Sequence, residues 1–124
     1  MSDLRPKAEQ IKLGNNEYGL RFTLNAIDEI QDHFDAPISK LVDILGDERK
    51  SFKAIKYILT VTVNEDIQVR KDEGEDVNLI DEKFVGRYID TKNMAEITNA
   101  LLRSFSTSIP ETEEEDIIPN EVSE

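Results

Sequence analysis

The chain has 124 residues, with 27 acidic residues against 15 lysines and arginines, and a net charge of -12 at pH 7. This length accommodates one domain, and the acidic balance disfavours binding to a nucleic-acid backbone, which requires lysine and arginine. Cysteine is absent, which excludes disulfides, thiol catalysis and cysteine-ligated zinc.

No targeting or membrane segment is expected. The first ten residues, MSDLRPKAEQ, are polar and lack the apolar core of a signal peptide. The apolar runs, such as Ile58–Leu59, are far shorter than the roughly 20 residues that a spanning helix needs. We therefore expect a soluble intracellular protein with no membrane partner.

The first element that the sequence predicts is a β-hairpin. Residues 10–13 alternate polar and apolar, and residues 18–23 alternate again after the cluster Gly14-Asn15-Asn16. Glycine and asparagine suit the tight turn of a hairpin. Tyr18 shares one face of the second strand with Leu20 and Phe22, so Gly19 faces the other way, where a partner element can approach closely. Residues 1–9 are expected to be a flexible N-terminus.

Two helices are predicted next. Leu24, Ile27, Ile30 and Phe34 recur at helical spacing, with Thr23 or Asn25 as the cap. A second apolar stripe follows Pro37, which suits a first helical turn, and it ends at Gly46. The members of this stripe are Ile38, Leu41, Val42 and Leu45.

Three further helices are predicted after Asp47, which can cap the first of them. Its stripe is Phe52, Ile55, Leu59 and Val63, although the β-branched run 59–63 also fits a strand. A charged loop covers 71–78. Asp81 can then cap a short helix with Phe84, Val85, Tyr88 and Ile89, and Asp90 or Thr91 can cap a last helix with Met94, Ile97, Ala100, Leu101, Leu102 and Phe105.

The acidity of the chain is concentrated at its C-terminal end. Residues 110–124, called here the acidic tail, contain seven acidic residues and no lysine or arginine. They therefore carry -7 of the net charge of -12, which leaves -5 for the rest of the chain. Such a composition cannot offset the entropy of ordering, so the tail is expected to be disordered. Its apolar pair Ile117-Ile118 follows the acidic run and suits a short docking motif, although a purely solubilising tail is the alternative.

No catalytic or metal-binding pattern stands out. His33 is the single histidine and has no HxH or HxxxH partner, so we expect a surface or boundary residue. The acidic run 72–76 fits no register of a calcium-binding EF-hand loop. The motifs of serine hydrolases and of phosphate-binding loops are missing. We expect a protein without enzymatic activity, cofactor or metal.

One basic cluster is predicted on the helix after Asp47. Arg49, Lys53 and Lys56 are spaced at three and four residues, which places them on one helix face. The overall acidity favours an ordinary solvated face over a nucleic-acid site. Attraction of the acidic tail to this face is a further possibility.

Residues 11–45 resemble the N-terminal half of the tail assembly chaperones of long-tailed phages and prophages. The matching residues are Leu13-Gly14, Tyr18, Leu20 to Leu24, Ala26-Ile27, Glu29-Ile30 and Ile38 to Leu41. The resemblance covers about a third of the chain, and the later helices fit it only loosely. It implies a non-enzymatic chaperone, located in the cytoplasm of the bacterial host and absent from the finished virion.

The resemblance also implies the partners. Chaperones of this family coat the tape measure protein, keep it soluble and recruit tail tube subunits, and a homo-oligomer is possible. Apolar residues at the end of the chain are the candidate partner-binding residues: Leu102, Phe105, Ile117 and Ile118. The alternative function is an acidic DNA mimic, or another phage inhibitor that acts on a host factor. That function would need rigidly arrayed carboxylates, whereas most of the excess charge lies in the acidic tail.

The expected fold is therefore α+β. An N-terminal β-hairpin packs on a small bundle of about five helices within a single domain at 10–109, and the disordered acidic tail follows at 110–124.

Overall fold

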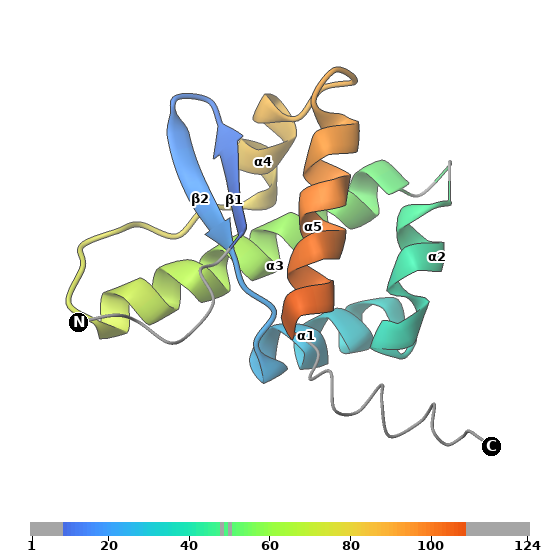
Figure 1. Ribbon diagram of the computed structural model, residues 1–124, viewed down its shortest axis with the longest axis horizontal. Coiled ribbons are helices and arrows are strands. Elements are labelled where there is room, and N and C mark those ends of the chain that lie inside the picture. The colour runs from blue at the N-terminus through green and yellow to red at the C-terminus, as the bar shows by residue number, and fades with distance from the viewer. Residues whose placement is uncertain (1–8, 48, 50, 109–124) are drawn as a thin grey trace.

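The computed structural model describes residues 9–47, 49 and 51–108, and within them the fold is α+β, as predicted (Figure 1). In chain order the elements are β1 (Glu9–Leu13), β2 (Asn16–Leu20), α1 (Leu24–Phe34), the 3-10 helix η1 (Ile38–Lys40), α2 (Leu41–Leu45), α3 (Ser51–Asp72), α4 (Glu82–Tyr88) and α5 (Met94–Ser108). Residues 1–8 of the predicted flexible N-terminus and the acidic tail lie outside the described residues, whereas Glu9 is the first residue of β1 and pairs with Leu20, so the strand begins one residue earlier than predicted.

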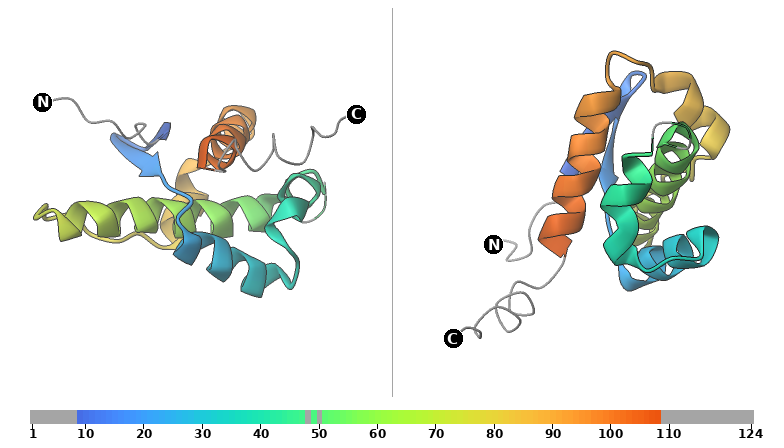
Figure 2. Two further views of the ribbon diagram at one scale, coloured as in Figure 1. Left: turned by 60° about the horizontal axis from the view of Figure 1, so that its bottom comes forward. Right: turned by 90° about the vertical axis from the view of Figure 1, so that its right-hand side faces the viewer.

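Helix α3 forms the centre of the fold. The hairpin and α5 lie on one side of it and α1 lies on the other (Figure 2). Strand β2 packs on α3 and strand β1 packs on α5, so the hairpin lies between these two helices. The core fills the space between them, and its largest fully buried side chains include Leu13, Leu20, Ile30, Ile58 and Leu101.

The hairpin forms where the alternation predicts it. Its strands pair antiparallel, with Leu13 opposite Asn16 and Ile11 opposite Tyr18. The turn residue Gly14 has φ of +65°, a left-handed conformation that glycine adopts without steric cost. A two-residue turn with glycine first matches the twist of the two strands, and this fixes the register.

The capping residues of the first two helices are largely those predicted. The Thr23 hydroxyl accepts a hydrogen bond from the Ala26 N–H at 3.1 Å, so Thr23 is the N-cap of α1. The second predicted helix is divided into η1 and α2, and Gly46 ends it as predicted. Leu24 is 83% exposed, so its predicted place in the apolar stripe of α1 is wrong. Leu24 is the first residue of α1, and the buried residues of this helix are Ala26 and Ile30.

The ambiguous run 59–63 is helical and belongs to α3, which has 22 residues. The hydroxyls of its threonines donate to the preceding turn, Thr62 to the Ile58 carbonyl at 2.9 Å and Thr60 to the Lys56 carbonyl at 2.7 Å. Burial of Leu59, Val61 and Val63 on several sides of the helix outweighs the strand preference of β-branched residues. The helix also continues through Asp72, beyond the predicted loop boundary.

One residue of the α3 stripe departs from the prediction. Phe52 is 56% exposed, whereas Ile55, Leu59 and Val63 are buried. Phe52 lies in the first turn of α3, where the ends of α4 and α5 leave a hollow beside it. The predicted core position therefore becomes a surface position.

The last two helices begin close to their predicted caps. The Asp81 carboxylate accepts from the Phe84 N–H at 2.9 Å and caps α4. The Asp90 carboxylate accepts from the N–H groups of Lys92 and Asn93 in the turn that precedes α5. Within the described residues, none of the helices combines the length and the apolar character needed to cross a membrane.

Candidate functional site: a groove beside the hairpin

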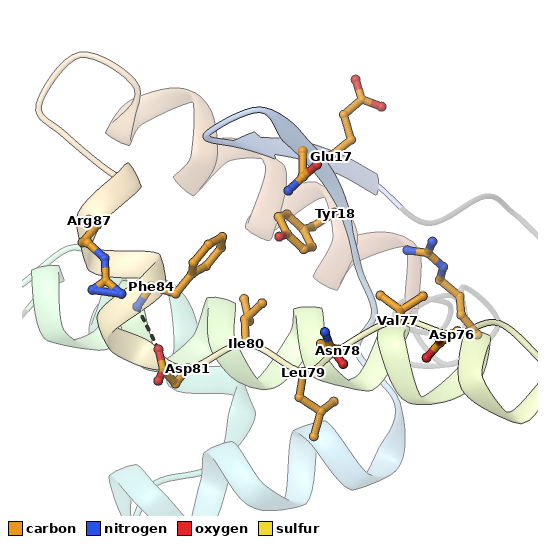
Figure 3. Close-up of a pocket in the computed structure, with 12 residues that line it drawn as sticks. Glu17, Tyr18, Asp76, Val77, Asn78, Leu79, Ile80, Asp81, Phe84 and Arg87 are labelled. Atoms are coloured by element: carbon orange, nitrogen blue, oxygen red, sulfur yellow. Dashed lines mark hydrogen bonds between the residues drawn. The ribbon is translucent and has the colours of Figure 1, made fainter.

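A groove of about 730 Å³ runs between the hairpin and the chain segment that joins α3 to α4. One wall is the first half of β2, from Asn16 to Tyr18, and the other is the extended segment 76–81 with the start of α4. Figure 3 shows Tyr18 and Phe84 facing each other across the groove, with Ile80 between them. Segments that are far apart in the sequence therefore form this site together.

The floor of the groove is apolar and partly aromatic. The rings of Tyr18 and Phe84 meet edge to face with centroids 5.9 Å apart, and Tyr88 continues the cluster at 5.1 Å from Phe84. Tyr18, Ile80 and Phe84 are half-buried and pack against the core. Each thus keeps part of its apolar surface available to a ligand.

The outer wall is held in place by Asn64 on α3. The Asn64 side-chain amide donates to the Ile80 carbonyl and its oxygen accepts from the Ile80 N–H, both at 2.9 Å. A single side chain thus satisfies both backbone groups of Ile80, as a neighbouring β-strand would. This pair of hydrogen bonds fixes a segment that has no regular secondary structure of its own.

The rim of the groove carries polar groups that have no partner among the described residues. The Arg87 guanidinium makes no ion pair or hydrogen bond with any described residue, and the same is true of the side-chain amides of Asn16 and Asn78. By contrast, Arg70 at the other end is held by Glu75 at 3.0 Å, and Asp81 is used as the cap of α4. Free amides can bond to a peptide backbone, and a free guanidinium can bind a carboxylate.

Ionisable side chains outside the groove take part in ring stacking and in an ion pair. His33 is exposed, as predicted, and its ring stacks on Tyr57 with centroids 3.7 Å apart. Arg21 and the buried Asp66 form an ion pair at 2.9 Å, which joins β2 to α3. In the described part of the chain, no group of three or more His, Asp or Glu side chains is placed to hold a metal ion.

The predicted partner-binding residues lie elsewhere in the fold. Leu102 is half-buried on α5 and lines a shallow hollow of about 420 Å³ with Glu9 and Arg103. Phe105 is half-buried one turn later and packs edge to face against Phe22 at 5.5 Å. Neither residue lines the groove. Ile117 and Ile118 lie outside the described residues, so the structure does not bear on them.

Sequence reasoning missed the groove itself. It assigned Tyr18 and Phe84 to a strand face and a helix stripe, and it treated residues 71–78 as a solvated loop. The signal that could have found the outer wall is the apolar pair Leu79-Ile80, which follows the charged run. Both residues line the groove, with Ile80 pointing toward Tyr18 and Phe84 and Leu79 pointing in the opposite direction (Figure 3).

Fold and site together define a small α+β protein with a surface groove of mixed apolar and polar character. Comparison with protein-family models, curated proteins and solved structures found no match for the chain.

Proposed function

We propose that this protein is a non-enzymatic tail assembly chaperone of a phage or prophage. In this function it binds apolar segments of the tape measure protein, keeps that protein soluble and recruits tail tube subunits in the bacterial cytoplasm. The observation that carries the proposal is the groove beside the hairpin. Its floor is apolar, and its rim holds amides and a guanidinium that have no partner within the described part of the chain. The sequence resemblance of residues 11–45 supplies the family.

The chemistry of the groove suits a protein segment as ligand. Tyr18, Ile80 and Phe84 offer apolar surface for the side chains of such a segment. Asn16 and Asn78 can bond to its backbone, and Arg87 can pair with an acidic side chain within it. Aromatic residues and arginine are the side chains that most often dominate binding energy at protein interfaces.

The charge of the chain also suits a chaperone. A protein that binds apolar segments must expose apolar surface and still avoid association with itself. Exposed apolar side chains are present at Leu24, Val42 and Phe52. A net charge of -12 provides self-repulsion that opposes aggregation through such residues.

The test is co-expression with a candidate tape measure protein from the same genome, followed by affinity purification through this chain. Arg87→Glu tests the groove, while Leu102→Glu and Ile118→Glu test α5 and the acidic tail. Lys40→Glu matches the charge change of Arg87→Glu at an exposed position away from the groove. Ala95→Glu introduces the same charge at an exposed position of α5 that lines neither the groove nor the hollow beside Leu102.

We expect the wild type and both controls to co-purify with soluble tape measure protein, and Arg87→Glu to lose most of it. Reduced recovery with Leu102→Glu or Ile118→Glu would add those residues to the binding surface. Circular dichroism of each variant separates loss of binding from loss of folding. Failure of the wild type to bind or solubilise the tape measure protein contradicts the proposal. Inhibition of a DNA-binding enzyme by the same chain would instead favour the acidic DNA mimic.

A further inference from the structure

A second hollow, called here the Phe52 pocket, lies where the first turns of α3 meet the end of α4 and the start of α5. It has a volume of about 250 Å³ and is lined by Phe52, Ile55, Lys56, Gly86, Ile89 and Met94. Most of this lining is apolar, and Phe52 at its edge is 56% exposed. The pocket is therefore an apolar depression that no described segment covers.

Two lysines that form no ion pair with another described residue lie at or near this apolar lining. The aliphatic part of the Lys56 side chain lies against α4. Its Cδ atom is 3.0 Å from the position that a Cβ atom at residue 86 would occupy. Lys56 is half-buried, yet its ammonium pairs with no carboxylate of the described residues, and neither does the exposed Lys53. The nearby acid Asp90 is bonded to backbone N–H groups of its own turn. A ligand for this pocket would therefore combine apolar side chains with negative charge.

The acidic tail has this combination. Its acidic run Glu113–Asp116 is followed directly by Ile117-Ile118. Isoleucine side chains match the apolar lining, and the four carboxylates before them match the cations at Lys53 and Lys56. The charge complementarity thus identifies a segment of the same chain as an occupant.

The length of the chain permits this contact within one molecule. The last described residue, Ser108, ends α5 at the opposite end from Met94, which lines the pocket. A 15-residue helix is about 22 Å long. Ile117 is nine positions after Ser108 in the sequence, and nine extended residue steps span roughly 30 Å. The tail can therefore run back along α5 and reach the Phe52 pocket.

We propose that Ile117-Ile118 docks in the Phe52 pocket of its own chain, with the preceding carboxylates near Lys53 and Lys56. This contact occupies the pocket in the free protein. The inference is independent of the proposed chaperone function, because it concerns the full chain without any partner.

Paramagnetic labelling tests the contact. The chain has no cysteine, so Ser123→Cys gives a single site for a nitroxide beside the docking segment. In an isotope-labelled full chain, we expect selective loss of amide signal at Phe52, Lys56, Gly86 and Ile89, restored when the nitroxide is reduced. Raising the salt from about 0.1 M to about 1 M shortens the Debye length from about 10 Å to about 3 Å and should weaken the effect.

Three double variants of the labelled chain test the contact, two of them at its predicted residues and one as a matched control. Ile117→Asp with Ile118→Asp, and separately Lys53→Glu with Lys56→Glu, should each abolish the selective loss. Lys40→Glu with Lys71→Glu changes the charge equally at exposed positions away from the pocket and should preserve it.

Three outcomes overturn the proposal. They are no signal loss at the pocket, equal loss over the whole domain, and loss at the groove residues Tyr18 and Phe84 instead. A fourth outcome comes from a mixture of two kinds of chain. One kind is isotope-labelled and has no nitroxide, and the other kind carries the nitroxide. The amide signals at the pocket would then be lost as strongly in this mixture as in the sample whose chains carry both labels. This result would show that a second copy provides the tail and would overturn docking within one chain.

Discussion

The carboxylate of Asp66 occupies the space that a side chain at Gly19 would need. A Cβ atom at position 19 would lie 2.6 Å from Oδ2 of Asp66 and 2.8 Å from its Cγ. Gly19 and Asp66 are both buried, and the same carboxylate forms an ion pair with Arg21, two residues after Gly19 and just beyond the end of β2. The absence of a side chain at position 19 therefore lets β2 approach α3 and form the ion pair.

Gly19→Ala should consequently destabilise the protein. The added methyl group must displace a buried charged group, and overpacking of this kind costs about 1–3 kcal/mol. Gly86→Ala is the matched control, because the only close neighbour of its Cβ is the flexible stem of Lys56 at 3.0 Å and alanine favours the helix. Urea unfolding measures both variants. Equal midpoints for the two would contradict the close packing at Gly19.

The Arg21–Asp66 ion pair gives a second prediction. Arg21→Ala leaves the Asp66 carboxylate buried without its counter-ion. We expect a loss of roughly 2–3 kcal/mol, less than for a fully buried pair because the Arg21 side chain is 32% exposed. Arg70→Ala removes an ion pair whose partner Glu75 is 47% exposed and should cost about 0.5 kcal/mol or less. Chemical denaturation compares them, and a similar loss for both would argue against a structural role of the buried pair.

Asn64 is predicted to control the outer wall of the groove. Asn64→Ala removes both hydrogen bonds to Ile80 and should cost about 1–3 kcal/mol, since two backbone groups lose their partners. The sharper measurement is hydrogen exchange, in which the Ile80 amide should exchange faster. Gln68→Ala on the exposed face of the same helix should leave that exchange rate unchanged. Unchanged protection of Ile80 in Asn64→Ala would show that other contacts hold the segment.

Tyr57 gives a prediction for alkaline pH. Burial raises the pKa of its hydroxyl above the ordinary value of 10.0, and the Glu29 carboxylate raises it further. The unfolded chain thus releases this proton at lower pH than the folded chain. The neutral hydroxyl contributes stability that is fully present below pH 10 or so, and this contribution is lost as the pH rises through the folded-state pKa.

Tyr57→Phe should therefore reduce the fall in stability above about pH 10 and change stability little at pH 7, because the Tyr57 hydroxyl lies 3.5 Å from the Glu29 carboxylate. Tyr88→Phe, at a side chain that is 42% exposed, is the control. Thermal unfolding over a pH series measures the effect. An alkaline fall in Tyr57→Phe that equals that of the wild type would refute it.

Local sequence signals determined the elements of this fold. Alternation around Gly14 predicted the hairpin, and the side chains of Thr23 and Asp81 predicted two helix starts, because turns and caps depend on residues within four positions of each other. The hairpin and the caps persist in the structure because the forces that form them act between residues close together in the chain. The sequence also predicted that a partner element can approach closely at Gly19, without indicating which element it is.

The tertiary structure alone decided which residues meet. Nothing local identifies Asp66 as the neighbour of Gly19, or joins Tyr18 to Phe84 and Ile80 in one groove. The same holds for the exposure of Leu24 and Phe52, since spacing on a helix indicates a shared face but not whether another element covers it. The elements follow from local chemistry, whereas the groove and the Phe52 pocket depend on how distant segments pack against α3.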